Sequence, residues 1–379
     1  MASASVSKAS IGAYQLVEKN PRDSAIINEV RMECRTLCKW ERETFPGSQP
    51  VSLTRKNLET LTRSPYVACE KSDGERHMLM VYKQAVYIID RMFNIYRVTL
   101  SLPDIDKTTL LDGELIMDAT PSAGKPVTIR YLVYDAVHVR GRSVATESLL
   151  HRLKAALVEV VRPRKAKQDD AFAIYVKDFF DVCHSATVVF PLGLRLPHMC
   201  DGLIFTPVND PYRAGTCQRL LKWKPAHMNT VDFVLDLVMG FEPEQVHAKL
   251  LAAVAGVQRH EDMWLARSGE MWNWLVANRK EVNGKVAECG WDPKIYTFVP
   301  SNRSDFVTTG TWVEGGGWIL HRIRDDRTIP NDESVVEKVK ASIADGISIE
   351  QLQATLGNTP KVRLPPKSAK RVRLAENGQ

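Results

Sequence analysis

The sequence lacks the long apolar runs that a membrane-spanning helix needs. Its best apolar stretch, residues 231–241, is interrupted by Asp232 and Asp236, whereas a spanning helix requires about 20 mostly apolar residues. The first residues, Met-Ala-Ser-Ala, do not provide the apolar core of a signal peptide. We therefore expect no membrane association. The chain also shows no internal repeat.

Cysteine is scarce and scattered. The chain of 379 residues contains 7 cysteines, an odd number, and no Cys/His spacing in it matches a structural zinc site. Such a set is typical of reduced thiols rather than of a disulfide framework. We therefore predict an intracellular protein.

The balance of apolar and charged residues is that of a soluble globular protein. Apolar residues make up 44% of the chain, charged residues make up 25%, and the formal net charge is +6. This modest positive charge suits anionic ligands without requiring nucleic acid. Because 379 residues are too many for one ordinary core, we predict two domains.

Helices mixed with turn-linked strands predict an α+β fold with largely antiparallel sheets. We expect residues 1–20 to be disordered and residues 21–229 to form the first domain. Within it, residues 66–70 and 77–90 have the apolar pattern of strands on either side of a turn at Lys71.

The composition shifts after Pro225. We predict a second domain at residues 230–330, a small β-barrel with a helical insertion at residues 243–280. Residues 331–358 have the spacing of two helices. Residues 359–379 are rich in proline and basic residues, and we expect them to form a disordered tail.

Residues 70–76, Glu-Lys-Ser-Asp-Gly-Glu-Arg, place Lys71 two residues before an Asp-Gly pair. Alone, this string is typical of a polar hairpin turn. A free lysine has a pKa of about 10.4, so it is a poor nucleophile at neutral pH. Nearby cations and a divalent metal disfavour its ammonium form, and Mg²⁺ held by carboxylates is the usual partner of phosphates. A lysine that attacks a nucleoside triphosphate therefore needs nearby cations and also carboxylates that hold a divalent metal.

Later segments carry such groups. Lys222 and Lys224 alternate with a tryptophan on a predicted strand, so both lysines share one face. Asp112 and Glu114 surround one glycine, and Asp201 precedes another. Taken alone, the lysines also fit a solvent-facing strand and the carboxylates also fit ordinary turns.

Two more segments have the right chemistry. Tyr134 is either a core aromatic or a face on which a purine stacks. Arg322 and Arg324 share a strand face and are followed by Asp326 and Arg327. An exposed basic strand is the alternative interpretation.

In this order, these segments resemble the motifs of the covalent nucleotidyltransferase superfamily, and most closely those of eukaryotic-type mRNA guanylyltransferases, the capping enzymes. The segments that carry the resemblance are FPGSQPVSL (45–53), EKSDGER (70–76), IDR (89–91), LLDGEL (110–115), YLVYDAVHVRG (131–141), DGLIFTPVNDPYRAGT (201–216), LLKWKP (220–225), NTVDF (229–233) and WILHRIRDDRTIPN (318–331). They span residues 45–331. Two of them, residues 201–216 and 220–225, are long and specific, whereas DNA and RNA ligases resemble only the shorter motifs.

The resemblance implies a nucleotidyltransferase domain, a C-terminal OB-fold domain and a GTP site in the cleft between them. Lys71 would be the nucleophile that forms a Lys–GMP phosphoramidate, and the 5′-diphosphate end of RNA would take GMP from it to give the GpppN cap. The catalytic residues implied are Lys71, Lys222 and Lys224. Those implied for GTP binding are Asp73, Arg76, Arg91, Glu114, Tyr134, Lys177, Arg324, Asp326 and Arg327. Those implied for binding Mg²⁺ or Mn²⁺ are Glu114, Asp201 and Asp232.

The resemblance also assigns individual roles to these residues. Arg76 and Glu114 would hold the ribose, Tyr134 would stack on guanine, Arg91 would contact phosphate and Lys177 would read the guanine O6. The three residues from the second domain would close over the pyrophosphate. In that motif, Arg327 stands where the family usually has lysine, so the planar guanidinium group of arginine replaces the compact ammonium group of lysine.

An ATP-dependent polynucleotide ligase and a non-catalytic scaffold for capping partners are the alternative functions. The segment LLKWKP and the last motif argue against a ligase. No RNA triphosphatase or methyltransferase module is recognisable, so separate proteins would supply those steps. Enzymes of this type act on nuclear transcripts and bind the phosphorylated C-terminal tail of RNA polymerase II, which implies a nuclear location. The basic residues 367–373 fit either a nuclear localisation signal or a solubilising end.

Overall fold

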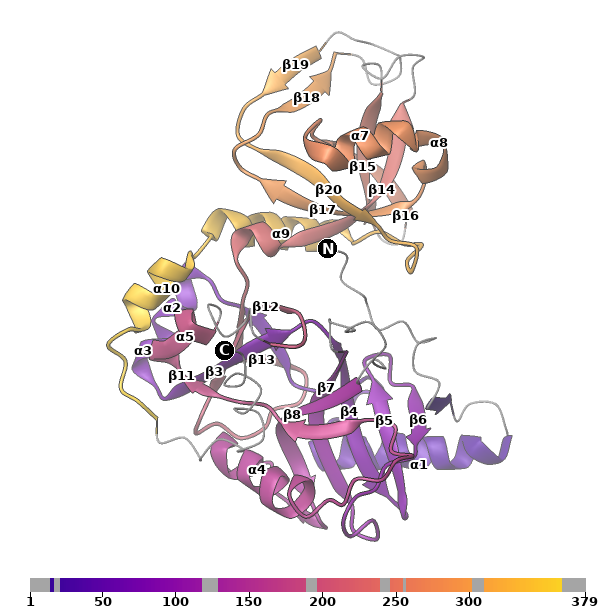
Figure 1. Cartoon of the computed structure of the whole chain (residues 1–379), viewed down its shortest axis with the longest axis vertical. Helices are drawn as coiled ribbons and strands as arrows, with labels where there is room; N and C mark the ends of the chain where they lie inside the picture. Colours follow the sequence, from indigo (N-terminus) through magenta and orange to yellow (C-terminus); the bar gives the residue numbers. More distant parts are fainter. Residues whose placement is uncertain are drawn as a thin grey trace, which may run out of the picture. The chain divides into compact units, whose positions relative to one another are not determined.

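The computed structural model describes residues 14–16, 21–117, 129–188, 196–238, 246–254, 257–301 and 310–362. The chain forms two compact units (Figure 1). Unit 1 combines residues 1–223 with residues 349–379, and unit 2 consists of residues 224–348. Helices and mainly antiparallel sheets together confirm the predicted α+β class. No helix among the described residues is long and apolar enough to cross a membrane.

The larger sheet of unit 1 has eight strands in the order β1-β6-β5-β4-β7-β8-β10, with β9 paired to β8. All pairs are antiparallel except β10 with β8. The strands are β1 (Tyr14–Leu16), β4 (Glu75–Tyr82), β5 (Ala85–Asp90), β6 (Ile95–Val98), β7 (Thr109–Met117), β8 (Ile129–Val139), β9 (Arg142–Ser143) and β10 (Ala173–Val176).

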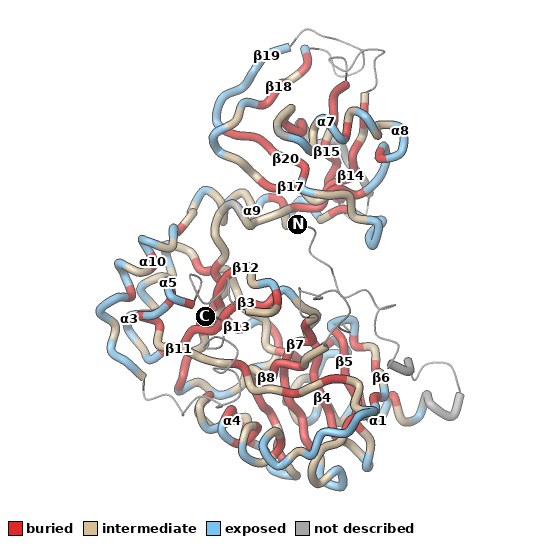
Figure 2. The backbone as a smooth tube through the Cα atoms, viewed as in Figure 1, coloured by how far each residue is buried: buried red, intermediate tan, exposed pale blue. Residues whose placement is uncertain are grey.

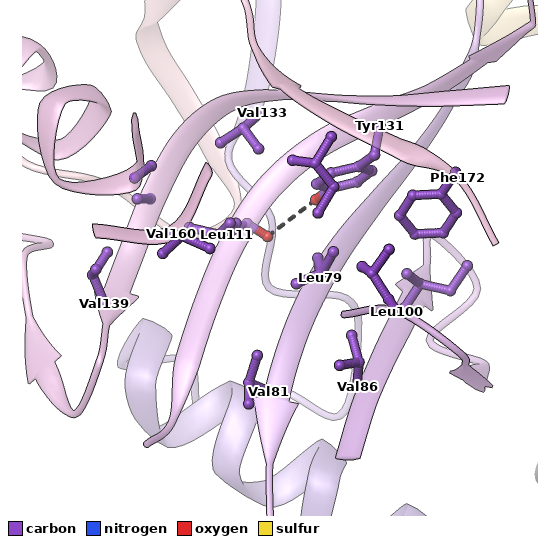
Figure 3. Packing of buried hydrophobic residues seen from close by; sticks show 14 of the residues in the cluster. Leu79, Val81, Val86, Leu100, Leu111, Tyr131, Val133, Val139, Val160 and Phe172 are labelled. Atoms are coloured by element: carbon purple, nitrogen blue, oxygen red, sulfur yellow. Dashed lines mark hydrogen bonds between the residues drawn. The ribbon is translucent and has the colours of Figure 1, made fainter. Parts of the chain in front are cut away.

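Successive side chains of a strand point to opposite faces of a sheet. In this sheet, buried clusters cover both faces. Met78 and Met80 of β4 pack with the apolar side of helix α1 (Pro21–Cys38). Leu79 and Val81 point the other way, into the cluster that Figure 3 shows. In that cluster the Tyr131 hydroxyl donates a hydrogen bond of 3.3 Å to the Leu111 carbonyl. Helix α4 (Leu149–Ala155) and its π-helical continuation η3 (Ala156–Val161) contact β8 beside this cluster.

The smaller sheet of unit 1 has five strands in the order β11-β3-β12-β13-β2. They are β2 (Gln49–Ser52), β3 (Tyr66–Ser72), β11 (Phe180–Asp181), β12 (Cys200–Pro207) and β13 (Thr216–Trp223). Short helices accompany them: α2 (Arg55–Leu58), α3 (Thr60–Arg63), η4 (Val182–His184) and α5 (Ser185–Thr187).

Helix α10 (Ile349–Leu356) returns to unit 1 after unit 2 is complete. Its Leu352 and Leu356 are fully buried. The Gln353 side chain donates a 2.8 Å hydrogen bond to the Cys183 carbonyl and accepts one of 3.2 Å from the Ala186 amide. These contacts join α10 to the short helices η4 and α5 of unit 1.

The strands flanking Lys71 are present, but the hairpin interpretation of residues 70–76 is wrong. Ser72 at the end of β3 pairs with Cys200 in the smaller sheet, whereas Glu75 at the start of β4 pairs with Leu115 in the larger sheet. The chain therefore crosses between sheets at Gly74. A Cβ atom on this glycine would lie 2.4 Å from the Leu115 carbonyl oxygen, so the crossing needs a residue without a side chain.

Unit 2 is built on a five-stranded antiparallel sheet in the order β16-β15-β14-β17-β20. Its strands are β14 (Thr230–Val238), β15 (His247–Val254), β16 (Val257–Trp264), β17 (Val286–Asp292) and β20 (Gly317–Ile323), and β18 (Thr297–Pro300) with β19 (Gly310–Val313) forms a separate hairpin. Its helices are η6 (Ala226–Met228), α7 (Gly269–Ala277), α8 (Arg279–Val282) and α9 (Glu333–Asp345). Phe233 and Trp318 meet edge to face in its core.

Three expectations about local structure need correction. Residues 247–254 and 257–264, placed in a helical insertion, form β15 and β16, because cross-strand pairing overrides the helix propensity of their leucines and alanines. Among the described residues of that segment, α7 and the start of α8 are the helical ones. The predicted barrel is not closed by any ladder among the described residues; one parallel bridge, Leu265 to Trp318, links the end of β16 to β20.

The third correction concerns the first residues of the chain. Within the segment expected to be disordered, Tyr14–Leu16 forms a strand that pairs with β6, because the edge of the larger sheet offers unpaired backbone groups. The other residues of that segment, and residues 363–379 of the expected tail, lie outside the described residues.

Candidate active site

A pocket in unit 1 is lined by residues of both sheets. Lys71 comes from the smaller sheet, and Arg76, Glu114 and Tyr134 come from three adjacent strands of the larger sheet. Six residues singled out from the sequence line it, namely Lys71, Arg76, Arg91, Glu114, Tyr134 and Lys177. The pocket combines cations, carboxylates and an aromatic ring, which is the chemistry that a nucleotide requires.

Lys71 forms an ion pair at this pocket. Its Nζ atom lies 2.8 Å and 3.0 Å from the two carboxylate oxygens of Asp201 on β12. The side chains of Lys71 and Asp201 are 25% and 17% exposed, respectively, so both remain accessible to a ligand. Residues 130 positions apart in the chain are therefore brought together where the strands β3 and β12 pair.

Asp112, on β7, is the most completely bonded group of the site. It is fully buried, and its carboxylate accepts hydrogen bonds from Arg76 Nε at 3.1 Å and from the second Arg76 nitrogen at 2.6 Å. The Tyr134 hydroxyl donates to it at 2.9 Å, and the Tyr212 hydroxyl donates at 2.6 Å. Four donors therefore converge on one carboxylate.

This network fixes the walls of the pocket. The Arg76 guanidinium also donates to the Ser48 carbonyl at 2.5 Å and lies over the rings of Phe45 and Tyr134. Burial opposes the charge of Arg76, but Asp112, Tyr134 and Tyr212 together outweigh it and raise the pKa of Arg76 well above its usual value. The guanidinium is thus held as a cation in one orientation.

Sequence reasoning counted Asp112 among the candidate carboxylates but gave it no individual role, and it did not single out Tyr212. Asp112 carried one usable signal, because strand alternation puts it on the same face as Glu114. Tyr212 lies in the irregular segment after β12, where no periodicity predicts which way a side chain points. Asp135 was also missed; it lines the pocket and accepts hydrogen bonds of 2.6 Å and 2.9 Å from the buried Arg152 of α4.

Lys177 belongs to a buried polar cluster behind Lys71. Its Nζ atom donates to Ser72 Oγ at 2.8 Å and lies 3.8 Å from Glu70 and 4.0 Å from Glu114. Burial opposes its charge, but Glu70 and the other anionic neighbours more than offset this and raise the pKa of Lys177. His198 approaches Ser72 Oγ at 3.4 Å. Lys177 is therefore a fixed cation at the inner end of the pocket.

Glu114 faces the same cations. Burial raises the pKa of Glu114, and the charges of Lys177 and Lys71 act in the opposite direction. The charge of Asp201 also acts on Glu114, so the two carboxylates lie in one electrostatic environment. No group of three or more His, Cys, Asp or Glu side chains suited to a metal occurs in the part of the chain that the structure describes.

Among the other predicted residues of unit 1, Arg91 lines the pocket, whereas Lys222 and Asp73 are not among its lining residues. Arg91 donates to the Gln49 side chain at 3.0 Å. Lys222 is on β13, opposite Ile204. The amide of Asp73 donates to the Met199 carbonyl at 2.9 Å, so this residue helps to shape the crossing at Gly74.

The remaining predicted residues belong to unit 2, and four of them form one cluster. The Arg324 guanidinium pairs with Asp326 at 2.8 Å and 2.7 Å and lies 3.3 Å from Asp232. Arg327 also pairs with Asp232. Hydrogen bonding from Arg324 lowers the pKa of Asp326 to about 2. Lys224 is the first residue of unit 2.

Comparisons with known proteins agree along nearly the whole chain. The family model described as "mRNA capping enzyme, catalytic domain" matches residues 11–226, and "mRNA capping enzyme, C-terminal domain" matches residues 228–353. The "mRNA-capping enzyme subunit alpha" of Schizosaccharomyces pombe is 31% identical, with 88% of this chain and 84% of that protein covered. The protein of the same name from Saccharomyces cerevisiae is 31% identical, with 83% and 79% covered.

Two further comparisons are more distant or partial. The "mRNA-capping enzyme" of Mus musculus is 30% identical over 86% of this chain but is covered over only 52% of its own length. Among solved structures, "mycobacterial DNA ligase D complexed with ATP and MES" is 16% identical with a TM-score of 0.40, covering 74% of this chain and 95% of that chain.

Proposed function

The chain belongs to the mRNA capping enzyme family, whose members are GTP:RNA guanylyltransferases, and we propose that it forms the cap through a GMP adduct on Lys71. The observation that carries this proposal is the position of Lys71 at a pocket lined by Arg76, Tyr134, Lys177 and Glu114. A strand holds the lysine, and its amine is accessible at the pocket. This is what in-line attack on a bound nucleotide requires.

In the first step, the Lys71 amine attacks the α-phosphorus of GTP. A nitrogen–phosphorus bond forms, the bond from that phosphorus to the bridging oxygen of the β-phosphate breaks, and pyrophosphate leaves. The Lys71 ammonium must lose one proton to become nucleophilic, and its nitrogen loses a second proton as the bond to phosphorus forms. Cations around the phosphates offset the charge that develops, and Arg91 with Lys222 and Lys224 are the side chains we assign to this task.

In the second step, a terminal oxygen of the 5′-diphosphate end of RNA attacks the GMP phosphorus. The nitrogen–phosphorus bond breaks, Lys71 recovers its proton, and the GpppN cap is released. Because the transfer occurs in two steps, the same lysine first takes GMP from GTP and then passes it to the RNA end. We assign Arg324, Asp326 and Arg327 to the pyrophosphate, as the last motif of the family implies.

The base and the ribose are assigned to the inner pocket. The Tyr134 hydroxyl is held by Asp112 at 2.9 Å, which leaves the ring face as the stacking surface for guanine. Lys177 is a buried donor at 2.8 Å from Ser72 Oγ, suited to a carbonyl oxygen such as the guanine O6. Arg76 and Glu114 would then contact the ribose.

A divalent ion, Mg²⁺ or Mn²⁺, fits the carboxylates of this site. Magnesium in phosphate-binding sites is held by one or two carboxylates and completed by substrate oxygens and water. Asp201 and Glu114 share one electrostatic environment beside Lys71, and we assign the ion to them, with Asp232 as a third candidate. When bound, the ion would supply positive charge to the phosphates.

The capping role in general implies a nuclear enzyme that acts on GTP and RNA. We propose the finer points on the family resemblance alone. A separate RNA triphosphatase would prepare the RNA end, a separate methyltransferase would modify the cap, and the phosphorylated tail of RNA polymerase II would recruit the enzyme.

The decisive experiment is labelling of the protein with α-³²P nucleotide and a divalent metal. We expect an acid-labile adduct from GTP but not from ATP, and its loss in Lys71→Ala. Chasing the purified adduct with RNA that carries a 5′-diphosphate should move the label into a cap. An adduct from ATP alone would instead indicate a ligase, and label on Lys71→Ala would mean that the nucleophile is another residue.

A further inference from the structure

An array of aromatic rings runs through unit 2 and ends at the surface. Trp264 contacts His247 edge to face at 6.2 Å, and His247 stacks on Phe298 at 5.5 Å. Phe298 in turn meets Trp312 at 5.4 Å. The three inner rings are buried, whereas Trp312 is 55% exposed. The array therefore presents one large ring to solvent on a rigid support.

The backbone explains this arrangement. Phe298 on β18 and Trp312 on β19 are directly opposite each other in an antiparallel hairpin, so their side chains share one face. Figure 2 shows that β19 is exposed along its length. A tryptophan on an exposed strand costs solvation unless something covers it, and large exposed apolar groups commonly mark interaction sites.

Cations lie among these rings. The Arg267 guanidinium is 4.2 Å from the centre of the Phe298 ring and 6.0 Å from that of Trp272. The Lys249 ammonium is 5.7 Å from the centre of the Trp264 ring. Positive charges interleaved with aromatic faces match the phosphates and bases of a single-stranded nucleic acid. Glu314, two residues after Trp312, accepts a 3.1 Å hydrogen bond from the exposed Tyr296, so a carboxylate paired with a hydroxyl borders the array at the open end of the hairpin.

The position of the array in the sheet agrees with this chemistry. Five-stranded sheets of the OB type bind oligonucleotides with the face of their second and third strands and with the loop between the fourth and fifth. In unit 2 the second and third strands in chain order are β15 and β16, which carry His247 and Trp264. The β18–β19 hairpin is the connection between the fourth and fifth strands, β17 and β20.

We propose that Trp312, supported by Phe298 and His247, is a stacking platform for an unpaired base of the RNA substrate. The platform binds RNA regardless of sequence, because every base has a flat face. Lys249 and Arg267 supply the positive charge for the neighbouring phosphates. This inference rests on the proposed function for its RNA substrate, but formation of the GMP adduct does not depend on it.

The test is binding of a short, fluorescent, single-stranded RNA to the full chain, measured by anisotropy. We expect Trp312→Ala to weaken binding roughly tenfold, which corresponds to about 1.4 kcal/mol. Trp312→Phe keeps a stacking face and should stay within roughly threefold of the wild type. Trp274→Ala is the matched control, because Trp274 is 42% exposed on α7 and lies outside the array.

Two further measurements separate the possible outcomes. GMP adduct formation should be unchanged in all three variants, while the RNA concentration needed for half-maximal cap transfer should rise in Trp312→Ala. Unchanged RNA affinity in Trp312→Ala would overturn the proposal, and it would do so even if that variant lost affinity for a protein partner. If wild type forms no adduct, the proposed function fails, and the RNA-binding comparison still decides the platform.

Discussion

The carboxylate of Asp112 allows a sharp test of how the pocket is held together. It is fully buried, and Arg76, whose side chain is 10% exposed, gives it two of its four hydrogen bonds. In Asp112→Asn the guanidinium remains buried without a counter-charge. Removing one partner of a buried ion pair costs about 3–5 kcal/mol. In Asp112→Asn, an NH2 group would also replace one carboxylate oxygen. This group would face two hydrogen-bond donors from which that oxygen accepts in the wild type.

We therefore expect Asp112→Asn to lower the free energy of unfolding by about 3–5 kcal/mol, a large part of the roughly 5–15 kcal/mol of a typical domain. The GTP concentration needed for half-maximal adduct formation should also rise, because Tyr134 and Arg76 lose their common anchor. Urea denaturation and adduct formation at varied GTP measure the two effects.

A matched variant separates charge from hydrogen bonding. Tyr212→Phe removes one donor to Asp112 but leaves the ion pair with Arg76 intact, so it should cost only about 1.5–3 kcal/mol. If Asp112→Asn is no less stable than Tyr212→Phe, or binds GTP as tightly as the wild type, the network does not hold the pocket as we argue.

Two further predictions concern the crossing at Gly74 and the loop around Asp170. Gly74→Ala should reduce both stability and adduct formation, because the new methyl group would meet the Leu115 carbonyl; normal labelling would contradict this. Burial disfavours the charge of Asp170, but hydrogen bonds from the Lys167 and Ser101 amides, aided by Arg164, lower its pKa. Its stabilising effect is therefore present above the ordinary aspartate pKa of about 3.9 and lost as pH falls through the lower folded value. Asp170→Asn should be about 3 kcal/mol less stable than the wild type at neutral pH and nearly equal in acid, and a constant difference in urea midpoints across pH would refute the assignment.

The order of the motifs was enough to find the pocket, and six of the residues it singled out line the pocket. Motif order works here because the segments lie on or next to strands of two sheets, and side chains from both sheets line one pocket. It could not reveal that Asp112 joins Arg76, Tyr134 and Tyr212. That network depends on rotamers and on an irregular segment, neither of which leaves a periodic signal.

Local patterns failed where tertiary pairing decided the outcome. Residues 70–76 look like a hairpin because Asp-Gly favours tight turns, yet the strands on either side pair with β12 and β7 instead of each other. Residues 247–254 are rich in helix formers, but they pair with β14 and β16. The partners of the strands around residues 70–76 are distant in the chain, so no short window of sequence contains them. The partners of residues 247–254 are neighbours in the chain, and there the cross-strand pairing outweighs the helix propensity of the segment.

The return of α10 to unit 1 has a consequence for the order in which the protein can fold during its synthesis. The residues of the pocket have all been made by Leu220, just before the translation of unit 2 begins at Lys224. The surface around Cys183 and Ala186 must nevertheless wait for Gln353, Leu352 and Leu356. A ribosome therefore has to finish the whole of unit 2 before unit 1 is covered. Completion of unit 1 thus requires that unit 2 has already been translated.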